Sequence, residues 1–160
     1  MNNGFMNDNK EKIQAIRNLP DELNAAVSGL SPVQLDTPYR DGGWTARQVV
    51  HHIADSHINA FVRMKLVLTE DHPTVKPYNE NSWAAMNDYT RDISPSIAVV
   101  SGVQERMANL LDDVKDEEWS RTLNHPENGV MTLQDLLNMY SDHGKHHVDQ
   151  ILGLRNRMGW

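Results

Sequence analysis

The sequence predicts an all-α protein, specifically a four-helix bundle, and two features carry that prediction. Four stretches have apolar residues that recur every three or four positions, which is the spacing of one face of an α-helix. Loops containing Pro, Gly and Asn separate these stretches. A chain of 160 residues fits one domain, residues 1–160, with a core large enough to fold alone.

The first helix is predicted from about Asp8 to Ser28. Its apolar stripe consists of Ile13, Ile16, Leu19, Leu23 and Val27. Pro20 predicts a kink or an early break, because its ring clashes with the preceding turn. Gly29 is expected to end the helix, and a connection containing Pro and Gly, Ser31–Gly43, follows.

The second and third helices have recognisable starts. Thr45 is the expected N-cap of a helix that continues to about Thr69. Its stripe is Val49, His52, Ile53, Ser56, Ala60, Met64 and Val67. The third helix is predicted to begin with Ser94 as its cap and Pro95 at the first helical position. Its stripe is Val99 or Val100, Val103, Met107, Leu110 and Val114.

The fourth helix is predicted from Thr132, with Asp135 completing the cap, to about Arg157. Its stripe is Leu133, Leu137, Tyr140, Gly144, His147, Ile151, Leu154 and Met158. A glycine in mid-helix costs about 1 kcal/mol relative to alanine. Two explanations of Gly144 stay open, a close approach of another backbone and a poorly optimised position.

The connections predict the order of the helices in space. The segment His72–Asp92 is too long for a tight helical hairpin, so it is expected to cross over and let the second and third helices run the same way. The result is an up-down-down-up bundle. One short helix is expected around Asn81–Met86 within the crossover. The connection Asp116–Met131 must turn sharply.

Composition and charge exclude several classes of protein. The chain carries 15 Lys and Arg against 22 Asp and Glu, and its pI is about 5.5, which is the wrong sign for a nucleic-acid-binding protein. Cysteine is absent, so disulfides and thiolate ligands are excluded. The sequence shows no membrane-spanning stretch and no apolar signal segment, so a cytoplasmic location is expected.

A pair of histidines on the fourth helix indicates a metal site. His143 and His147 are four residues apart, so their rings project from one face of the helix, beside the stripe that faces the core. Buried imidazoles need polar partners, and a metal ion is one. His52 lies on the core-facing stripe of the second helix and can complete a three-histidine site with an open coordination position. Zinc is the expected ion and nickel the next.

The alternative is that these rings only pack and form hydrogen bonds. The side chains expected to satisfy them in that case are Asp55, Tyr140, Asp142 and Asp149. If a metal is bound, the candidates for orienting its ligands are Asp55, Asp142 and Gln150. Among the other histidines, His51 and His146 are expected at the surface or behind the ligands, and His72 and His125 in loops. His57 is not assigned.

Two segments, Gly43–His57 and Asp142–Ile151, resemble the DinB superfamily. They look most like its YfiT branch of metal-dependent hydrolases related to bacillithiol S-transferases, and Leu35–Arg40 and Met158–Trp160 extend the resemblance. The resemblance implies a four-helix bundle, often dimeric, with a divalent metal on three histidines that map onto His52, His143 and His147. Gln150 stands where YfiT-like chains often carry histidine and resembles the H-x-x-Q pattern of DinB proteins.

These observations predict a metal-dependent enzyme with one divalent ion per subunit. A hydrolase that acts on a small molecule through metal-activated water is the leading hypothesis. A low-molecular-weight thiol (bacillithiol-type) S-transferase using a metal-bound thiolate is the first alternative. A metal-binding module without turnover and a helical interaction protein are the others. The expected partners are the small-molecule substrate and a second copy of the chain, with no nucleic acid and no membrane.

No catalytic base is assigned. The H-E-x-x-H motif of metalloproteases is absent, because Gly144, Lys145 and His146 stand between the two histidines. Arg155 and Arg157 complement the dipole of the last helix and are also candidates to receive a substrate carboxylate.

Overall fold

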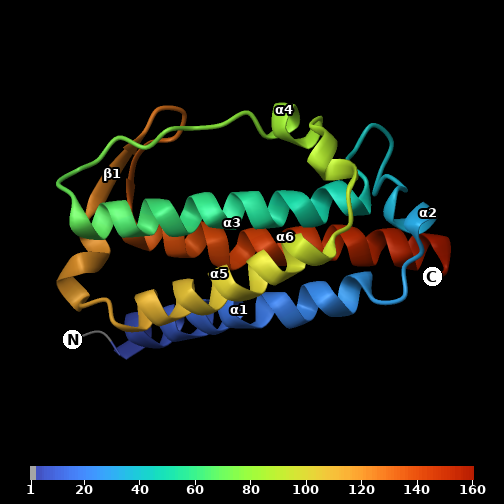
Figure 1. Ribbon diagram of the computed structural model, residues 1–160. Coiled ribbons are helices and arrows are strands. Elements are labelled where there is room, and N and C mark those ends of the chain that lie inside the picture. Colours follow the sequence, from blue (N-terminus) through green and yellow to red (C-terminus); the bar gives the residue numbers. More distant parts are fainter. Residues whose placement is uncertain (1–2) are drawn as a thin grey trace.

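The computed structural model describes residues 3–160, with the side chains described from residue 7 onward, and four long helices dominate it (Figure 1). They are α1 (Asn3–Val27), α3 (Ala46–Thr69), α5 (Ser94–Asp112) and α6 (Leu133–Met158). Helices α3 and α5 run in the same direction, opposite to α1 and α6 (Figure 1). The predicted up-down-down-up bundle is therefore confirmed.

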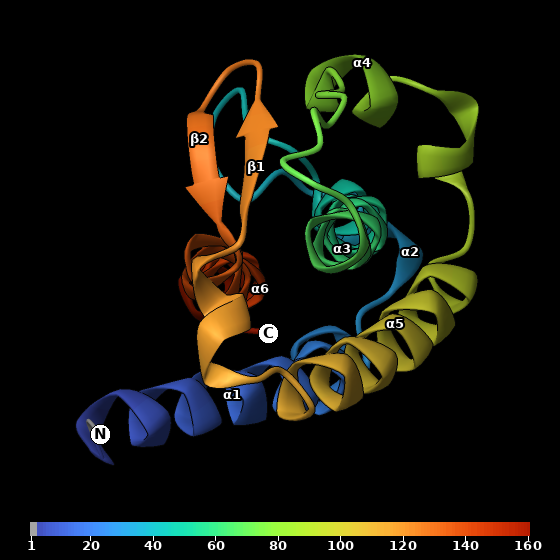
Figure 2. The ribbon, with the colours of Figure 1, turned by 90° about the vertical axis from the view of Figure 1, so that its left-hand side faces the viewer.

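The bundle has two layers, and a third layer of irregular chain covers one of them. Helices α3 and α6 form one layer and α1 and α5 the other, and each helix packs mainly against its layer partner and one helix of the opposite layer, α6 against α1 and α3 against α5 (Figure 2). The crossover and a hairpin lie over α3 and α6 (Figure 2). None of the described helices is long and apolar enough to cross a membrane.

Helix α1 corrects one expectation. It continues through Pro20 to Val27, so the early break that Pro20 predicted is wrong. Its predicted stripe is buried throughout, and packing of that face against α5 and α6 holds the helix together across the proline. Gly29 ends the segment with a φ of +74°, a conformation that glycine adopts readily. A short helix, α2 (Pro32–Leu35), follows.

The predicted N-cap of α3 is confirmed, and the predicted N-cap of α5 is wrong. The Thr45 side chain accepts a hydrogen bond from the Gln48 N–H, and the Gln48 side chain accepts one from the Thr45 N–H, which confirms the cap of α3. Ser94, in contrast, is the first residue of α5 and does not cap it. Ile93 is the N-cap and makes no side-chain cap hydrogen bond, while the Asp92 Oδ1 accepts from the N–H of Ser94, the first helical residue, at 2.7 Å.

The crossover between α3 and α5 contains the expected short helix, α4 (Glu80–Ala84), and a 3-10 turn, η1 (Asn87–Thr90). Tyr89 from this turn is buried against α3, and its hydroxyl donates to the Asp55 carboxylate at 2.6 Å. This contact attaches the second half of the crossover to α3.

The connection between α5 and α6 forms structure that the sequence did not predict. It contains a 3-10 turn, η2 (Asp116–Ser120), and an antiparallel hairpin of β1 (Thr122–His125) and β2 (Gly129–Thr132). The crossover joins this hairpin, because the Val75 N–H donates to the Asn124 carbonyl and the Asn124 N–H donates to the Pro73 carbonyl. The Thr132 and Asp135 side chains then cap α6 as expected.

Two apolar clusters make up the core, and a layer of polar side chains lies between them. One cluster lies near Met64, Met107 and Leu137, and the other lies near Ile53, Val100 and Ile151. On α3, α5 and α6 the residues between the two clusters include histidines and a glutamine: His57, Gln104, His143 and His147. The histidines therefore lie at mid-length of the bundle.

Candidate metal centre

Three histidines from α3 and α6 meet in the polar layer. One ring nitrogen from each of His52, His143 and His147 lies within 4.8 Å of the other two. The His143 Nε2 is 3.3 Å from the His52 Nε2 and 3.2 Å from the His147 Nε2. For zinc–nitrogen bonds of about 2.0–2.1 Å in a tetrahedron, neighbouring ligand nitrogens lie about 3.3–3.4 Å apart. The spacing of the three nitrogens fits one ion between them.

Two of the three rings are oriented by hydrogen bonds at their second nitrogen. The His57 Nδ1–H donates to the Gln104 Oε1 at 2.9 Å, which leaves the His57 Nε2 as an acceptor 3.2 Å from the His143 Nδ1. His143 therefore carries its proton on Nδ1 and presents the lone pair of Nε2 to the cluster. In this way Gln104, on a third helix, fixes the tautomer of His143.

His147 is oriented in the same manner from its own helix. Its Nδ1–H donates to the Gln150 Oε1 at 2.8 Å, and the Gln150 amide nitrogen donates to the His146 Nε2 at 3.0 Å. The Nε2 of His147 again faces the cluster. Hydrogen bonds of this kind fix ring orientation and raise the basicity of a ligand.

His52 is held by packing. Its ring centroid is 4.7 Å from that of Trp44, and its Nδ1 is buried with no hydrogen-bond partner among the described residues. The only polar contact of the His52 ring among the described residues is therefore made by its Nε2, which faces the His143 Nε2 in the cluster.

Burial keeps the four clustered rings neutral. Loss of hydration lowers the pKa of His52 to about 3, with a further contribution from the charges of His147 and His57. Burial likewise lowers the pKa of His143 to about 2 and that of His57 to about 4, and it lowers the pKa of His147. Neutral imidazole is the form that binds metal, so no protons need to be displaced at neutral pH.

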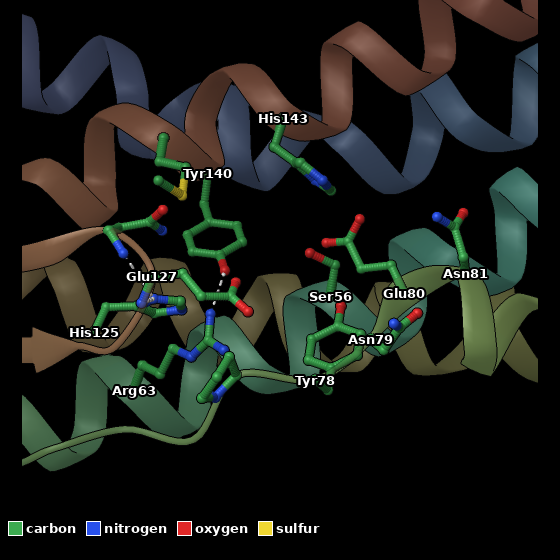
Figure 3. A pocket seen from close by; sticks show the side chains of 13 residues that line it. Ser56, Arg63, Tyr78, Asn79, Glu80, Asn81, His125, Glu127, Tyr140 and His143 are labelled. Atoms are coloured by element: carbon green, nitrogen blue, oxygen red, sulfur yellow. Dashed lines mark hydrogen bonds between the residues drawn. The ribbon is translucent and has the colours of Figure 1, made fainter.

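A cavity of about 440 Å³ reaches one side of this cluster (Figure 3). Ser56 and Arg63 line it from α3, and Tyr140 and His143 line it from α6. The crossover contributes Tyr78 and Glu80, and the hairpin contributes His125 and Glu127. His143 is thus the member of the cluster that a molecule in this cavity can approach.

Of the three residues expected to orient the ligands, Gln150 contacts one of the clustered histidines, whereas Asp55 and Asp142 do not. Gln150 contacts His147 as described, whereas Asp55 bonds to Tyr89 in the crossover. Asp142 is exposed, and Asp149 pairs with Lys145 on the surface.

Arg155 and Arg157, the candidates for receiving a substrate carboxylate, lie away from the cluster. They donate to backbone carbonyls of Ala26, Ser28 and Tyr39, so they join the end of α6 to the rest of the chain.

Two histidines lie where the sequence did not place them. His51 is buried, since α5 and the end of the crossover cover it, and its ring contacts the Ser96 hydroxyl at 2.7 Å. His125 belongs to β1 and is buried, with its Nδ1 accepting from the Glu127 and Asn128 N–H groups. His146 is exposed and His72 lies in an exposed turn, both as expected.

The sequence analysis did not identify Arg63 as a cavity residue, and it placed Tyr140 on the core-facing stripe as a partner for the histidine rings without predicting the cavity. A signal existed for Arg63, because it lies seven residues after Ser56 and eleven after His52 and therefore shares their face of α3. A charged residue on a core-facing stripe is as unusual as a histidine there.

The fold and the cluster define the class: a four-helix bundle with three inward-facing histidines on two neighbouring helices. Residues 15–151 match the DinB superfamily, and the chain belongs to it. A Bacillus cereus (strain B4264) protein, whose name presents it provisionally as a metal-dependent hydrolase, is 46% identical over 148 residues, covering 92% of this chain and 86% of the relative. A Bacillus anthracis (strain CDC 684) protein of the same name is 45% identical with the same coverage.

Solved structures show the same fold. YfiT from Bacillus subtilis, described as a probable metal-dependent hydrolase with an unusual four-helix bundle topology, superposes with a TM-score of 0.92 at 42% identity, covering 95% of this chain and 88% of YfiT. A mycothiol-dependent maleylpyruvate isomerase superposes with a TM-score of 0.71 at 17% identity, covering 89% of this chain and 60% of the isomerase. The isomerase supports the fold alone.

Proposed function

We propose that the protein is a metal-dependent hydrolase of a small molecule, with His52, His143 and His147 as the metal ligands. The spacing of the three Nε2 atoms, 3.2 and 3.3 Å from His143 to the other two, carries the proposal. The relatives' names support metal-dependent hydrolysis as the activity. Zinc is the proposed ion, with nickel as the second candidate, since both suit imidazole ligands.

The protein's own side chains would prepare the site for this chemistry. Gln104 and His57 hold the His143 lone pair toward the ion, and Gln150 does the same for His147. A divalent ion with an open position lowers the pKa of water and polarises a carbonyl, so water can add across an ester or amide bond. Tyr78 and Tyr140 remain protonated donors at the cavity wall, because burial raises the pKa of both hydroxyls.

The experiment measures metal content and turnover together. Protein purified without an affinity tag should contain about one equivalent of a divalent metal per chain, as a three-imidazole site predicts. His143→Ala should lose that metal, whereas His146→Ala, on the exposed face of the same helix, should retain it. Metal-loaded protein should release product from members of a panel of small esters and amides, and His143→Ala should not.

The thiol S-transferase is the alternative that the same experiment separates. If product forms only when a low-molecular-weight thiol is added, the result would favour thiol transfer over hydrolysis. Equal metal content in His143→Ala and the wild type would contradict the proposed ligands. Metal-loaded protein that is inactive across the panel, with and without thiol, would favour a metal-binding module. The homodimer and the cytoplasmic location stay predictions from the sequence.

A further inference from the structure

Arg63 is a buried cation in the wall of the cavity that reaches His143. It is 9% exposed, and its guanidinium donates to the Tyr140 hydroxyl at 3.2 Å and to the Lys76 carbonyl at 3.3 Å. No carboxylate of the described residues lies within 4.0 Å of it. Buried charges are normally paired, so an unpaired guanidinium needs an explanation.

A second buried arginine provides the contrast. Arg47 is 8% exposed, and the Asp36 carboxylate accepts from its Nε at 2.6 Å. The same chain therefore pairs one buried guanidinium with an acid and leaves the other facing a cavity. Arg63 would complete its set of contacts if a molecule in the cavity supplied the acid.

The neighbours of Arg63 are also hydrogen-bond donors. The Tyr140 hydroxyl accepts from Arg63 and keeps its own hydrogen, which either the neighbouring Ser56 hydroxyl or a molecule in the cavity can accept. The Tyr78 hydroxyl is buried and has no partner among the described residues. Figure 3 shows these side chains and Ser56 around the same cavity. Such a set of donors suits an acceptor-only group.

Negative charges in the cavity lining limit which anion can bind. Glu80 and Glu127 line the same cavity and are exposed. Two carboxylates in the cavity lining disfavour a doubly charged group such as phosphate, and they affect a single carboxylate less. A guanidinium also matches the two oxygens of a carboxylate in a planar, bidentate arrangement.

We propose that Arg63 binds a carboxylate of the substrate, with the reacting bond directed toward His143. Only the placement of the reacting bond near His143 rests on the proposed function; the carboxylate site does not. Tyr140 connects the two ends, because its hydroxyl contacts Arg63 and its ring centroid is 5.8 Å from that of His143. The substrate class is a small ester or amide that carries one carboxylate.

Binding to the metal-free protein tests the carboxylate site independently of catalysis. The probes are N-acetylglycine, its uncharged amide N-acetylglycinamide, and inorganic phosphate, each titrated while protein NMR shifts are followed. We expect N-acetylglycine to bind at least tenfold more tightly than the other two, with the largest shifts near Arg63. Equal binding of the acid and the amide, no binding of the acid, or tighter binding of phosphate would overturn the proposal.

Two variants and an activity measurement complete the test. Arg63→Lys keeps the charge but loses the planar fork, so it should weaken N-acetylglycine binding at least fivefold, whereas Arg47→Lys should not change it. With metal bound, mono-4-nitrophenyl glutarate should exceed 4-nitrophenyl acetate in kcat/KM, and Arg63→Lys should remove that preference. Acid binding that depends on Arg63 without turnover of either ester would contradict only the hydrolase proposal. Should Arg63→Lys fail to fold, the comparison of acid and amide on the wild type still decides.

Discussion

Among individual side chains, His57 best illustrates what the sequence and the structure each contribute. Its ring is fully buried and connects Gln104 on α5 to His143 on α6. The stripe pattern selected His52, His143 and His147 because each lies on the side of its helix that faces the core of the bundle. It did not assign His57, because the role of that ring depends on which residue a third helix places beside it.

Replacement of His57 should weaken metal binding without removing a ligand. His57→Leu takes away the acceptor for the His143 Nδ1–H, so the tautomer of His143 is no longer fixed. We expect metal affinity to fall about 10–100-fold, the usual effect of removing a group that orients a ligand. Competition with a chromophoric chelator would measure it.

Conservative replacement provides the control. Gln can accept a hydrogen bond from His143, so His57→Gln should recover part of the affinity that His57→Leu loses. His72→Asn, in an exposed turn, should leave affinity unchanged. Equal affinity in His57→Leu and the wild type would show that Gln104 and His57 do not orient the ligand.

At the scale of the helices, the close contact between α1 and α6 depends on Gly144. A methyl group at this position would lie 2.3 Å from the Leu19 Cδ2 and 2.7 Å from its Cδ1. Leu19 is itself buried, so it has little room to move. The neighbour is a buried side chain and not another backbone, so packing of Leu19 explains this glycine better than either alternative raised from the sequence.

Gly144→Ala should therefore destabilise the protein, although alanine is the better helix former. The propensity gain is about 1 kcal/mol. Overpacking of a filled core typically costs about 1–3 kcal/mol, so we expect a net loss. Urea unfolding measures it, and Leu19→Val in the same chain should recover part of the loss.

Gly153 supplies a matched control on the same helix. A methyl group there meets no atom within 4 Å, so Gly153→Ala should raise the free energy of unfolding by up to about 1 kcal/mol. A similar gain from Gly144→Ala would mean that α1 and α6 are not in close contact at Leu19.

The element boundaries show where sequence patterns are sufficient. The caps of α3 and α6 were predictable because their hydrogen bonds join residues three apart. The β1–β2 hairpin was missed because its strands have four residues each and are stabilised by residues 73–75, which are distant in sequence. The predicted cap of α5 was wrong because Ser94 is already helical, with its N–H bonded to the Asp92 carboxylate.

For the molecule as a whole, the neutral histidine layer predicts a loss of stability in mild acid. The pKa values of His52, His57 and His143 fall to about 3, 4 and 2 in the folded protein. In the unfolded chain they return to about 6.5. Below pH 6.5 the unfolded state therefore binds more protons, so the free energy of unfolding falls as the pH falls.

Urea unfolding of the metal-free protein at several pH values tests this dependence. Between pH 6.5 and about 4 each buried histidine contributes a slope of up to about 1.4 kcal/mol per pH unit. His57→Leu removes one such group and should have a shallower slope. A constant stability from pH 7 to pH 5 would contradict the neutral, buried state of the rings.

Metal binding should stabilise the whole fold, because the ligands come from two helices that the long crossover and the hairpin connect only indirectly. At a free zinc concentration 100 times the Kd, the expected gain is about 2.7 kcal/mol. For a chain of this size that corresponds to a rise in Tm of roughly 5–10 °C. Calorimetry with zinc and with a chelator measures the difference, which His143→Ala should abolish.

The topology was predictable at this scale, whereas the cavity was not. A crossover of this length can span the bundle and lets α3 and α5 run parallel, so the topology was predictable from loop lengths. The cavity requires knowing that the hairpin and the crossover both cover α3 and α6, and no periodic pattern encodes that contact (Figure 2).

The polar layer at mid-length of the bundle has a consequence for how the chain selects one alignment. A shift of α3, α5 or α6 by one turn would place imidazole or amide groups opposite apolar side chains, where their hydrogen-bonding needs would go unmet. The histidines and Gln104 thus favour one alignment of these three helices, in addition to any chemistry they perform. A bundle with a wholly aliphatic interior would tolerate several staggered packings, and this one excludes them.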